Sequence, residues 1–181
     1  PVPSELYTPH RRDPVRCTKA NELDREGNTV PDARLDREAI EALIPHRDPF
    51  IFVDRIIEVT YGKRAVGILD DVAAHTEHVL RGHFPGYPVL PGAIIVEALA
   101  EVGGVAALGM PENTGKLALL TGLDRWKFRH PARPGDQLRL ETNLLRYRRN
   151  FGRAAARATI GDALCAEGEI SFALVDRPPG L

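Results

Sequence analysis

A rigid loop followed by an apolar helix is the stretch that most constrains what this chain can form. The loop, Gly82–Gly92, contains three glycines and three prolines. Proline lacks a backbone N–H and glycine permits unusual dihedrals, so this segment forms neither regular helix nor strand. From Ala93 to Leu108 the only charged residues are Glu97 and Glu101. Pro91 suits a first helical turn, where no N–H is needed. We therefore expect a constrained loop leading into a buried helix over 93–108.

Several features of this stretch together indicate chemistry rather than packing. The start of the helix offers free N–H groups and the positive end of a dipole. His83 can move a proton near neutral pH, and burial of Glu97 would favour its acid form, as a general acid requires. Each feature also has a simpler explanation. A histidine in such a loop is often structural, and Glu97 and Glu101 could share a narrow solvent-facing stripe.

The same residues resemble a known enzyme family. The run His83–Gly92 reads His-Phe-Pro-Gly-Tyr-Pro-Val-Leu-Pro-Gly, and Glu97 opens Glu-Ala-Leu-Ala. This pattern resembles the FabZ-type 3-hydroxyacyl-acyl carrier protein dehydratases of fatty acid synthesis. In that family the loop histidine and a helix glutamate fourteen positions later form the catalytic pair. The same spacing separates His83 from Glu97 here, so the resemblance assigns the pair to these two residues.

The resemblance extends over roughly residues 36–176 and implies a fold. Its further motifs are Leu43–Arg55, Leu123–Arg129 and Pro134–Gln137. Members of the family have the hot dog fold, in which a curved antiparallel sheet wraps one long helix. We therefore expect a hot dog domain over residues 35–181, preceded by an N-terminal arm of unknown role over residues 1–34. The resemblance does not reach the arm.

The hydrophobic pattern independently favours an α+β fold of this kind. A short helix is expected over 35–44, with Asp36 as its N-cap, and strands over 50–59 and 63–72. Four strand candidates follow the central helix with little between them, three of them at 137–144, 153–160 and 166–174. A helix that is apolar nearly all round must be enclosed, and a curved antiparallel sheet can enclose it. A parallel sheet would need helices between the late strands.

Composition excludes several function classes. The formal net charge of −1 does not indicate wholesale binding to nucleic acid or membrane, and no apolar run approaches the length of a membrane span. The N-terminal segment has no apolar signal-peptide core. Ser4 and Ser171 are the only serines, which argues against a serine hydrolase. Cys17 and Cys165 have no metal-ligand spacing, so we expect reduced thiols in a cytoplasmic protein.

Basic residues are concentrated between Lys116 and Arg157. For Arg139, Arg153 and Arg157 we expect an ordinary solvated strand face. A tighter group could dock an acidic acyl carrier protein and its phosphopantetheine phosphate. This group consists of Arg125, Lys127, Arg129 and Arg133. Trp126 and Phe128 lie between these basic residues and are expected to pack rather than to stack on nucleic acid.

Three further histidines are expected to have lesser roles. His46 could be a second active-site group, but its place in a loop favours a capping or surface role. His75 and His78 flank Glu77 without further ligands at a sensible spacing, so no metal site is expected.

The resemblance implies a mechanism without metal or organic cofactor. His83 would remove the C2 proton of a (3R)-3-hydroxyacyl thioester, and Glu97 would protonate the departing C3 hydroxyl. The Gly92 N–H would hold the thioester carbonyl, and the Val89 carbonyl would fix the tautomer of His83. The site would be shared between two chains of a dimer, with a hexamer or a hetero-oligomer with a second dehydratase as further options. The rival functions are a hot dog thioesterase and a non-catalytic carrier-binding subunit, in either fatty acid or polyketide synthesis.

Glu101 departs from the family, which usually has glutamine at this position. Carboxylates at i and i+4 disfavour double ionisation, so one pKa is expected to rise. We hypothesise that Glu101 helps to keep Glu97 protonated. The alternative is that the exchange spoils a hydrogen bond of the family and slows the enzyme.

Overall fold

The computed structural model describes residues 34–74, 76–148, 150–178 and 180. The expected arm over residues 1–34 therefore lies outside the described residues except for Arg34, as do Cys17 and His75. Ten elements follow one another: α1 (Arg37–Leu43), β1 (Arg55–Thr60), β2 (Arg64–Leu69), α2 (Glu77–Leu80), α3 (Gly92–Leu108), η1 (Pro111–Asn113), β3 (Lys116–Phe128), β4 (Leu138–Arg148), β5 (Phe151–Ile160) and β6 (Ala163–Asp176).

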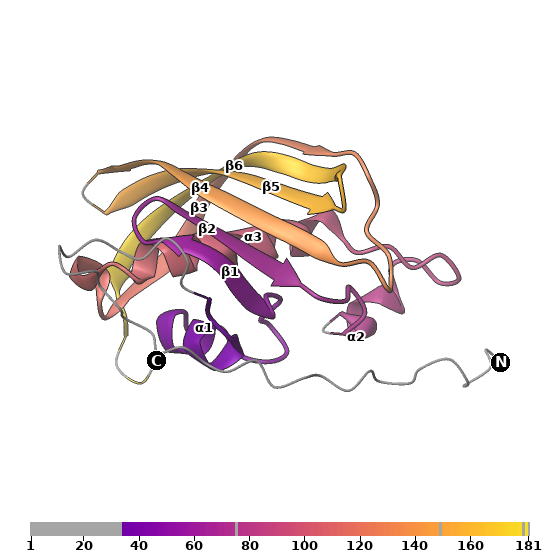
Figure 1. The fold of residues 1–181 in the computed structure, drawn as a ribbon, viewed down its shortest axis with the longest axis horizontal. Coiled ribbons are helices and arrows are strands. Elements are labelled where there is room, and N and C mark those ends of the chain that lie inside the picture. Colours follow the sequence, from indigo (N-terminus) through magenta and orange to yellow (C-terminus); the bar gives the residue numbers. More distant parts are fainter. Residues whose placement is uncertain (1–33, 75, 149, 179, 181) are drawn as a thin grey trace.

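One antiparallel sheet holds the six strands, in the order β1-β2-β4-β5-β6-β3. It curves over α3, with α1 beside β1 and the short α2 near one end of the sheet (Figure 1). The late strands follow one another through tight turns and pair as neighbours, apart from β3, which pairs with β6. The expected α+β architecture, a curved antiparallel sheet around one long helix, is confirmed.

Helix α3 is buried along most of its length, and every residue from Glu101 to Leu108 is buried. Its contact with the sheet is close enough to require small residues. A Cβ at Gly67 of β2 would lie 2.7 Å from a methyl group of Val102, closer than real side chains pack. On β4, the Thr142 hydroxyl donates to the Leu99 carbonyl of α3 at 2.8 Å. The helix is therefore enclosed by the sheet, as its apolar sequence predicts.

The period-2 pattern of the late strands is confirmed by their burial. Ala154, Ala156 and Ala158 of β5 face the core with at most 3% exposure. Leu138 and Leu140 of β4 are fully buried. The intervening residues of both strands lie on the outer face, so only one face of the sheet contributes to the core.

The first helix and strands differ in their bounds from the sequence prediction. Helix α1 begins at Arg37, and Asp36 is its N-cap, as expected, accepting from the Ala39 N–H at 3.0 Å. Leu35, predicted to be helical, instead forms a β-bridge with Ile56. The strand expected from residue 50 begins only at Arg55, because the N–H groups of Phe52 and Val53 donate to a glutamate side chain on α3 instead of to a strand.

The edges of the sheet matter for assembly. Among the described strands, β3 pairs with β6 on one side only, so its other edge is open along thirteen residues. Leu119, Leu120 and Leu123 of this strand are between 45% and 48% exposed.

Within the described residues, no helix is long and apolar enough to cross a membrane.

Candidate active site

The histidine of the loop is held by its own loop. His83 Nδ1 lies 2.8 Å from the Val89 carbonyl oxygen, and the Val89 N–H donates to the His83 carbonyl at 3.0 Å. Because a carbonyl can only accept, Nδ1 carries the proton in this contact and the lone pair lies on Nε2. The contact expected between Val89 and His83 is therefore present, and it leaves Nε2 able to act as a base.

His83 lines a groove of about 500 Å³ at the start of α3, together with Gly92, Phe128 and Arg129. Gly92 is the first residue of the helix, so its N–H has no acceptor within the helix. A Cβ at Gly92 would lie 2.6 Å from the Phe128 ring. Only glycine therefore lets this ring pack over the helix start, and the free N–H lies in the same groove as His83.

Glu97 lies in a different cavity. It lines a space of about 90 Å³ between α3 and the inner face of the sheet, whose other walls include Ala100, Thr142 and Phe172. Leu119 and Leu120 of the open edge strand also border this cavity. No lining residue is common to the His83 groove and the Glu97 cavity. The two residues of the predicted pair therefore face separate spaces within one chain.

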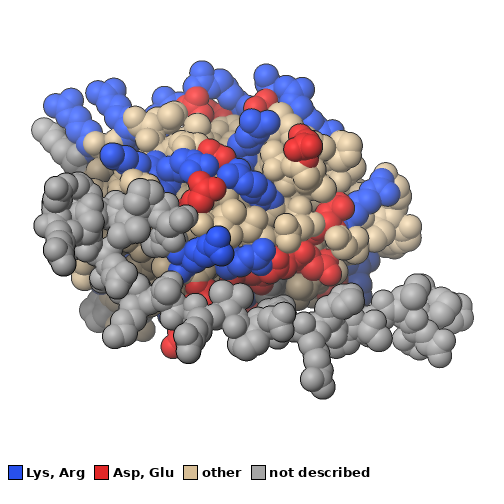
Figure 2. Space-filling model, viewed as in Figure 1, with Lys and Arg blue, Asp and Glu red and all other residues tan. Residues whose placement is uncertain are grey.

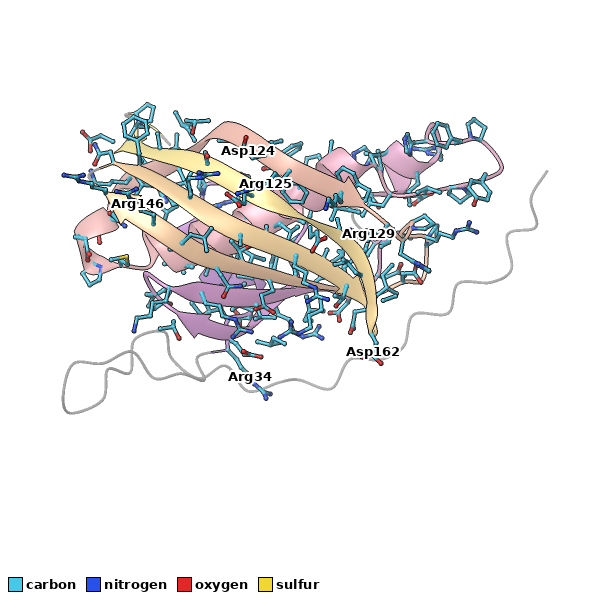
Figure 3. The ribbon with its side chains drawn as sticks, turned by 90° about the horizontal axis from the view of Figure 1, so that it is seen from above. Arg34, Asp124, Arg125, Arg129, Arg146 and Asp162 are labelled. Carbon is cyan, nitrogen blue, oxygen red and sulfur yellow. The ribbon has the colours of Figure 1, made fainter. Side chains whose placement is uncertain are left out.

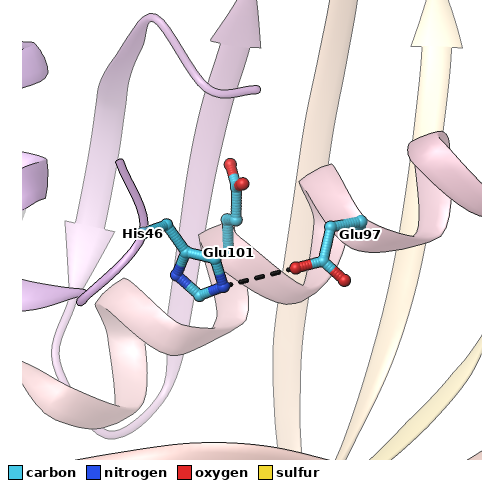
Figure 4. Close-up of side chains that lie close together, drawn as sticks. All are labelled: His46, Glu97 and Glu101. Atoms are coloured by element: carbon cyan, nitrogen blue, oxygen red, sulfur yellow. Dashed lines mark ion pairs between the residues drawn. The ribbon is translucent and has the colours of Figure 1, made fainter. Parts of the chain in front are cut away.

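His46 faces Glu97, which favours the alternative of a second active-site group over the preferred prediction of a capping or surface role. Its Nε2 lies 3.3 Å from Glu97 Oε1, across the gap between the loop after α1 and helix α3 (Figure 4). Its side chain is 27% exposed. The loop carries His46 to α3 because α1 packs against the helix that bears Glu97. The Ile-Pro-His-Arg run within the FabZ-like motif was the signal that could have indicated this role.

Glu101 is buried, so the simple interpretation of a solvent-facing stripe was wrong for this residue. It is 1% exposed and accepts hydrogen bonds from the N–H groups of Phe52 and Val53 at 2.9–3.2 Å. Burial raises the pKa of Glu101 to about 8, with a smaller contribution from the charge of Glu97. The expectation that one carboxyl pKa rises is met, but desolvation rather than like-charge repulsion is the main cause. At neutral pH the side chain is an uncharged acid, close in shape to the glutamine that the family usually has.

His46, Glu97 and Glu101 have polar atoms that all lie within 4.8 Å of one another. Among the described residues, they form the one group of at least three histidine, cysteine or acidic side chains that is compact enough for a metal ion. Both oxygens of Glu101 already accept from backbone N–H groups, and Glu97 already contacts His46. These contacts favour a hydrogen-bonded cluster, and the absence of a metal ion stays a prediction.

The four predicted docking residues separate into two pairs. Arg125 and Lys127 line a shallow groove on the outer face of the sheet, and Arg125 pairs with Glu169. Arg129 borders the His83 groove, although it also lies 3.4 Å from Glu167. Arg133 donates to the Tyr87 hydroxyl and stacks over the ring of this residue in the His83 loop. Figure 3 shows Arg125 over the middle of the sheet and Arg129 nearer the loop.

The outer face of the sheet carries both positively and negatively charged side chains. Figure 2 shows basic and acidic side chains interspersed over this face. Arg139 pairs with Glu58 and Glu141, and Arg153 pairs with Asp124 and Glu169. The expectation that these arginines belong to an ordinary strand face is confirmed.

Cys165 is a free, buried thiol whose pKa is raised to about 11, mainly by burial.

Comparison with known proteins decides the family. A FabA-like domain model matches residues 44–169. A 3-hydroxyacyl-[acyl-carrier-protein] dehydratase FabZ from Chloroflexus aggregans is 51% identical over 142 residues, which cover 78% of this chain and 97% of the relative. A FabZ from Geobacillus thermodenitrificans is also 51% identical, covering 80% of this chain and 98% of the relative. The chain belongs to the FabZ-type dehydratases.

Solved structures agree on the fold of this FabZ-type chain. The dehydratase heterocomplex ApeI:P from Xenorhabdus doucetiae matches with a TM-score of 0.64 at 19% identity, covering 76% of this chain and 91% of the other. A sigma28-regulated virulence protein from Campylobacter jejuni matches with a TM-score of 0.58 at 18% identity, covering 78% and 92% of the two chains. At such low identities these matches concern the fold alone.

Proposed function

We propose that this FabZ-type dehydratase uses His83 and Glu97 as its catalytic pair. The reaction is the reversible loss of water from a (3R)-3-hydroxyacyl-acyl carrier protein to give the trans-2-enoyl thioester. The observation that carries the proposal is the geometry of His83. Its Nδ1 is 2.8 Å from the Val89 carbonyl, and its ring lies in the same groove as the first N–H of α3. A base and an oxyanion donor thus border one space.

The first half of the reaction takes place in the His83 groove. Nε2 removes the proton from C2, next to the thioester carbonyl. Negative charge then develops on the carbonyl oxygen, where the Gly92 N–H and the positive end of the α3 dipole stabilise it. The Val89 carbonyl holds the resulting imidazolium through Nδ1. No metal or organic cofactor is needed for this step, and the acyl chain arrives on the phosphopantetheine of its carrier.

The second half requires a proton for the leaving hydroxyl at C3, and Glu97 supplies it. The carboxyl group lies in a small cavity with mostly apolar walls. Such walls exclude water, so the acid donates to the substrate rather than to solvent. The departing hydroxyl takes the proton and leaves as water. The enzyme is reset when the proton held by His83 is lost and Glu97 is protonated again.

The site is proposed to form between two copies of the chain, His83 from one and Glu97 from the other. Two observations support this. His83 and Glu97 line separate spaces within one chain. Strand β3, which ends beside the His83 groove and borders the Glu97 cavity, has an open edge with exposed leucines. A long apolar edge strand invites pairing with another strand, and a second copy would supply it.

Carrier docking is proposed at Arg129, which lines the His83 groove, and at Arg133, which donates to Tyr87 of the His83 loop. Arginine recognises phosphate groups well, and the carrier surface is acidic. Arg125 and Lys127, on the outer face, serve as the matched control. Replacing Arg129 and Arg133 by glutamine should raise KM for the acyl carrier protein substrate about tenfold with little change in kcat. The same replacements at Arg125 and Lys127 should change neither. Equal effects of the two pairs would reject this docking site.

The direct test is to incubate the protein with 3-hydroxyacyl carriers of several chain lengths and to measure the loss of water by mass. The parent should produce the enoyl thioester, and His83→Ala should be slower by at least about a hundredfold. If His83→Ala turns over as fast as the parent, the proposed pair is rejected. Appearance of free carrier thiol, without enoyl product, would instead support a thioesterase.

A further inference from the structure

We propose that His46 is a positioning residue for Glu97, and that its Nε2–H donates to Oε1 so that the acid proton of Glu97 lies on Oε2. This inference rests on the proposed role of Glu97 as the acid. The contact is specific, since Nε2 lies 3.3 Å from Oε1. Both side chains are largely covered, with exposures of 27% and 24%. Figure 4 shows the imidazole ring directed at the carboxyl group from a separate segment of the chain.

The loop that bears His46 is held in place by its own hydrogen bonds. The guanidinium of Arg47 donates to the carbonyls of Ile44 and His46 at 3.0 and 2.6 Å. Further along, the N–H groups of Phe52 and Val53 donate to Glu101, one turn after Glu97 on α3. The loop is therefore held by its own bonds around the imidazole, anchored to α3 after it through Glu101 and before it by the packing of α1 against α3. A histidine held in this way can orient its partner, since its own position is determined elsewhere.

The environment of the second ring nitrogen indicates the tautomer. Nδ1 of His46 is buried and has no hydrogen-bond partner among the described residues. A buried N–H without an acceptor costs more than an unused lone pair. The favoured tautomer of the ring therefore has its lone pair on Nδ1 and its proton on Nε2. In this form the nitrogen that faces Glu97 is a donor.

A donor at Oε1 determines where the proton of Glu97 lies. A protonated carboxyl group has one accepting carbonyl oxygen and one O–H. When the imidazole N–H occupies Oε1, the O–H is at Oε2, the oxygen that the histidine does not hold. The side chain cannot then rotate freely between a productive and an unproductive orientation. Val89 orients His83 in the same way on the other half of the reaction, where a carbonyl fixes the protonated nitrogen.

Other charged groups near the cluster do not substitute for this contact. Glu101 lies on the same helix, and its oxygens accept from Phe52 and Val53. Arg37 of α1 acts on Glu101 only through its charge, and its own side chain donates to the Val53 carbonyl and pairs with Glu41. Among the residues that line the Glu97 cavity, His46 is the one with an ionisable ring.

The test compares two amide side chains at position 46. The amide of glutamine can reach the place of Nε2, whereas that of asparagine reaches only the place of Nδ1. We expect His46→Gln to keep kcat within about threefold of the parent, and His46→Asn to lower kcat by about 10- to 100-fold, with KM unchanged within about twofold for both. His46→Phe keeps the ring volume without a donor and should match His46→Asn. His78→Ala, at an exposed histidine of α2, is the control and should leave both constants unchanged.

The outcomes separate this inference from the proposal on which it rests. Parental kcat in His46→Asn and His46→Phe would overturn the role of His46, as would a His46→Gln variant as slow as His46→Asn. A loss confined to KM would also overturn it, because positioning of a proton donor acts on kcat. Glu97→Gln is measured alongside. If Glu97→Gln is inactive while His46→Asn is parental, only the role of His46 fails; if Glu97→Gln is fully active, the proposed acid fails. Thermal unfolding of each variant verifies that it is folded.

Discussion

Two glutamates, one on the inner and one on the outer side of the sheet, have pKa values shifted in opposite directions. On the inner side, Glu101 of α3 is buried against Phe52 and Val53, and burial raises its pKa to about 8. On the outer side, hydrogen bonds from Arg64, with further ones from Arg139 and Asn143, lower the pKa of Glu141 to about 2. Glu58 completes this outer network through Arg64 and Arg139.

The difference shows how the same residue type is used in two ways. The outer network neutralises each carboxylate with a guanidinium in a partly solvated place, where charge is inexpensive. Glu101 accepts from backbone N–H groups, and Arg37 acts on it only through a smaller charge effect, so burial keeps this acid protonated. Glu97, the proposed general acid, lies one turn earlier on the same helix and contacts His46. We therefore expect activity to depend on this inner group, whereas the outer network should affect only stability.

The largest expected effect concerns activity. Glu97→Gln should lower kcat by at least about a hundredfold, because it removes the general acid. Glu141→Gln, the same change on the outer face, should keep kcat within about twofold, since no part of the site contacts it. Steady-state assays with a 3-hydroxyacyl carrier measure both. A comparable loss of kcat in Glu141→Gln would contradict the claim that activity depends on the inner glutamates alone.

A second prediction concerns the pH dependence of stability at Glu101. The folded pKa of about 8 exceeds the ordinary value of 4.5. The folded state thus keeps a proton that the unfolded state loses between these values, and stability falls as the pH rises toward 8. Glutamine at this position does not titrate, so the variant escapes this loss. The free energy of unfolding of Glu101→Gln minus that of the parent should therefore increase by on the order of 3 kcal/mol from pH 5 to pH 8. Urea unfolding at both pH values measures this gain, and parallel curves for the two proteins would contradict it.

The same variant examines the departure from the family. Neutral Glu101 and glutamine both accept from Phe52 and Val53, so at pH 7 Glu101→Gln should have parental kcat within about threefold. Above pH 8 the parent carries a negative charge on Glu101 near Glu97. This charge disfavours ionisation of Glu97 and helps it to keep its proton, so the variant should become relatively slower. An unchanged ratio of the two rates from pH 7 to pH 9 would reject an influence of Glu101 on Glu97.

The smallest effect is expected at Glu141. Its folded pKa of about 2 lies below the ordinary 4.5, so its contribution is present above pH 4.5 and is lost as the pH falls through 2. Because the network is partly exposed, Glu141→Gln should destabilise the protein by only about 1 kcal/mol at pH 7. The difference from the parent should vanish near pH 2. A destabilisation that persists in acid would show that Glu141 acts through packing instead of charge.

Much of this architecture could be predicted from the sequence, because the relevant patterns are local. The glycines and prolines of the His83 loop, the apolar run of α3 and the alternation in β4 and β5 each indicate one structure. The proposed catalytic pair, His83 and Glu97, rests on its spacing and family motif and stays a prediction. The N-cap at Asp36 was likewise visible, since an N-cap depends only on the neighbouring residues.

The rest depended on contacts between distant segments. Glu101 bonds to backbone groups 48 and 49 residues away, so neither its burial nor the late start of β1 follows from local pattern. His46 contacts Glu97 across a similar separation. The basic residues 125–133 are close in sequence, but Arg125 and Lys127 line one groove and Arg129 lines another. Which of them dock a carrier stays a prediction.

The central claim is that His83 of one copy acts with Glu97 of another, and complementation tests it most directly. His83→Ala and Glu97→Gln chains, each inactive alone, are unfolded together in equal amounts, refolded and assayed. If the site is shared, one of the two sites in each mixed dimer is intact, and random mixing should restore about a quarter of the parental activity. A mixture that stays as inactive as the separate variants, although mixed dimers are detected by native mass spectrometry, would contradict the claim.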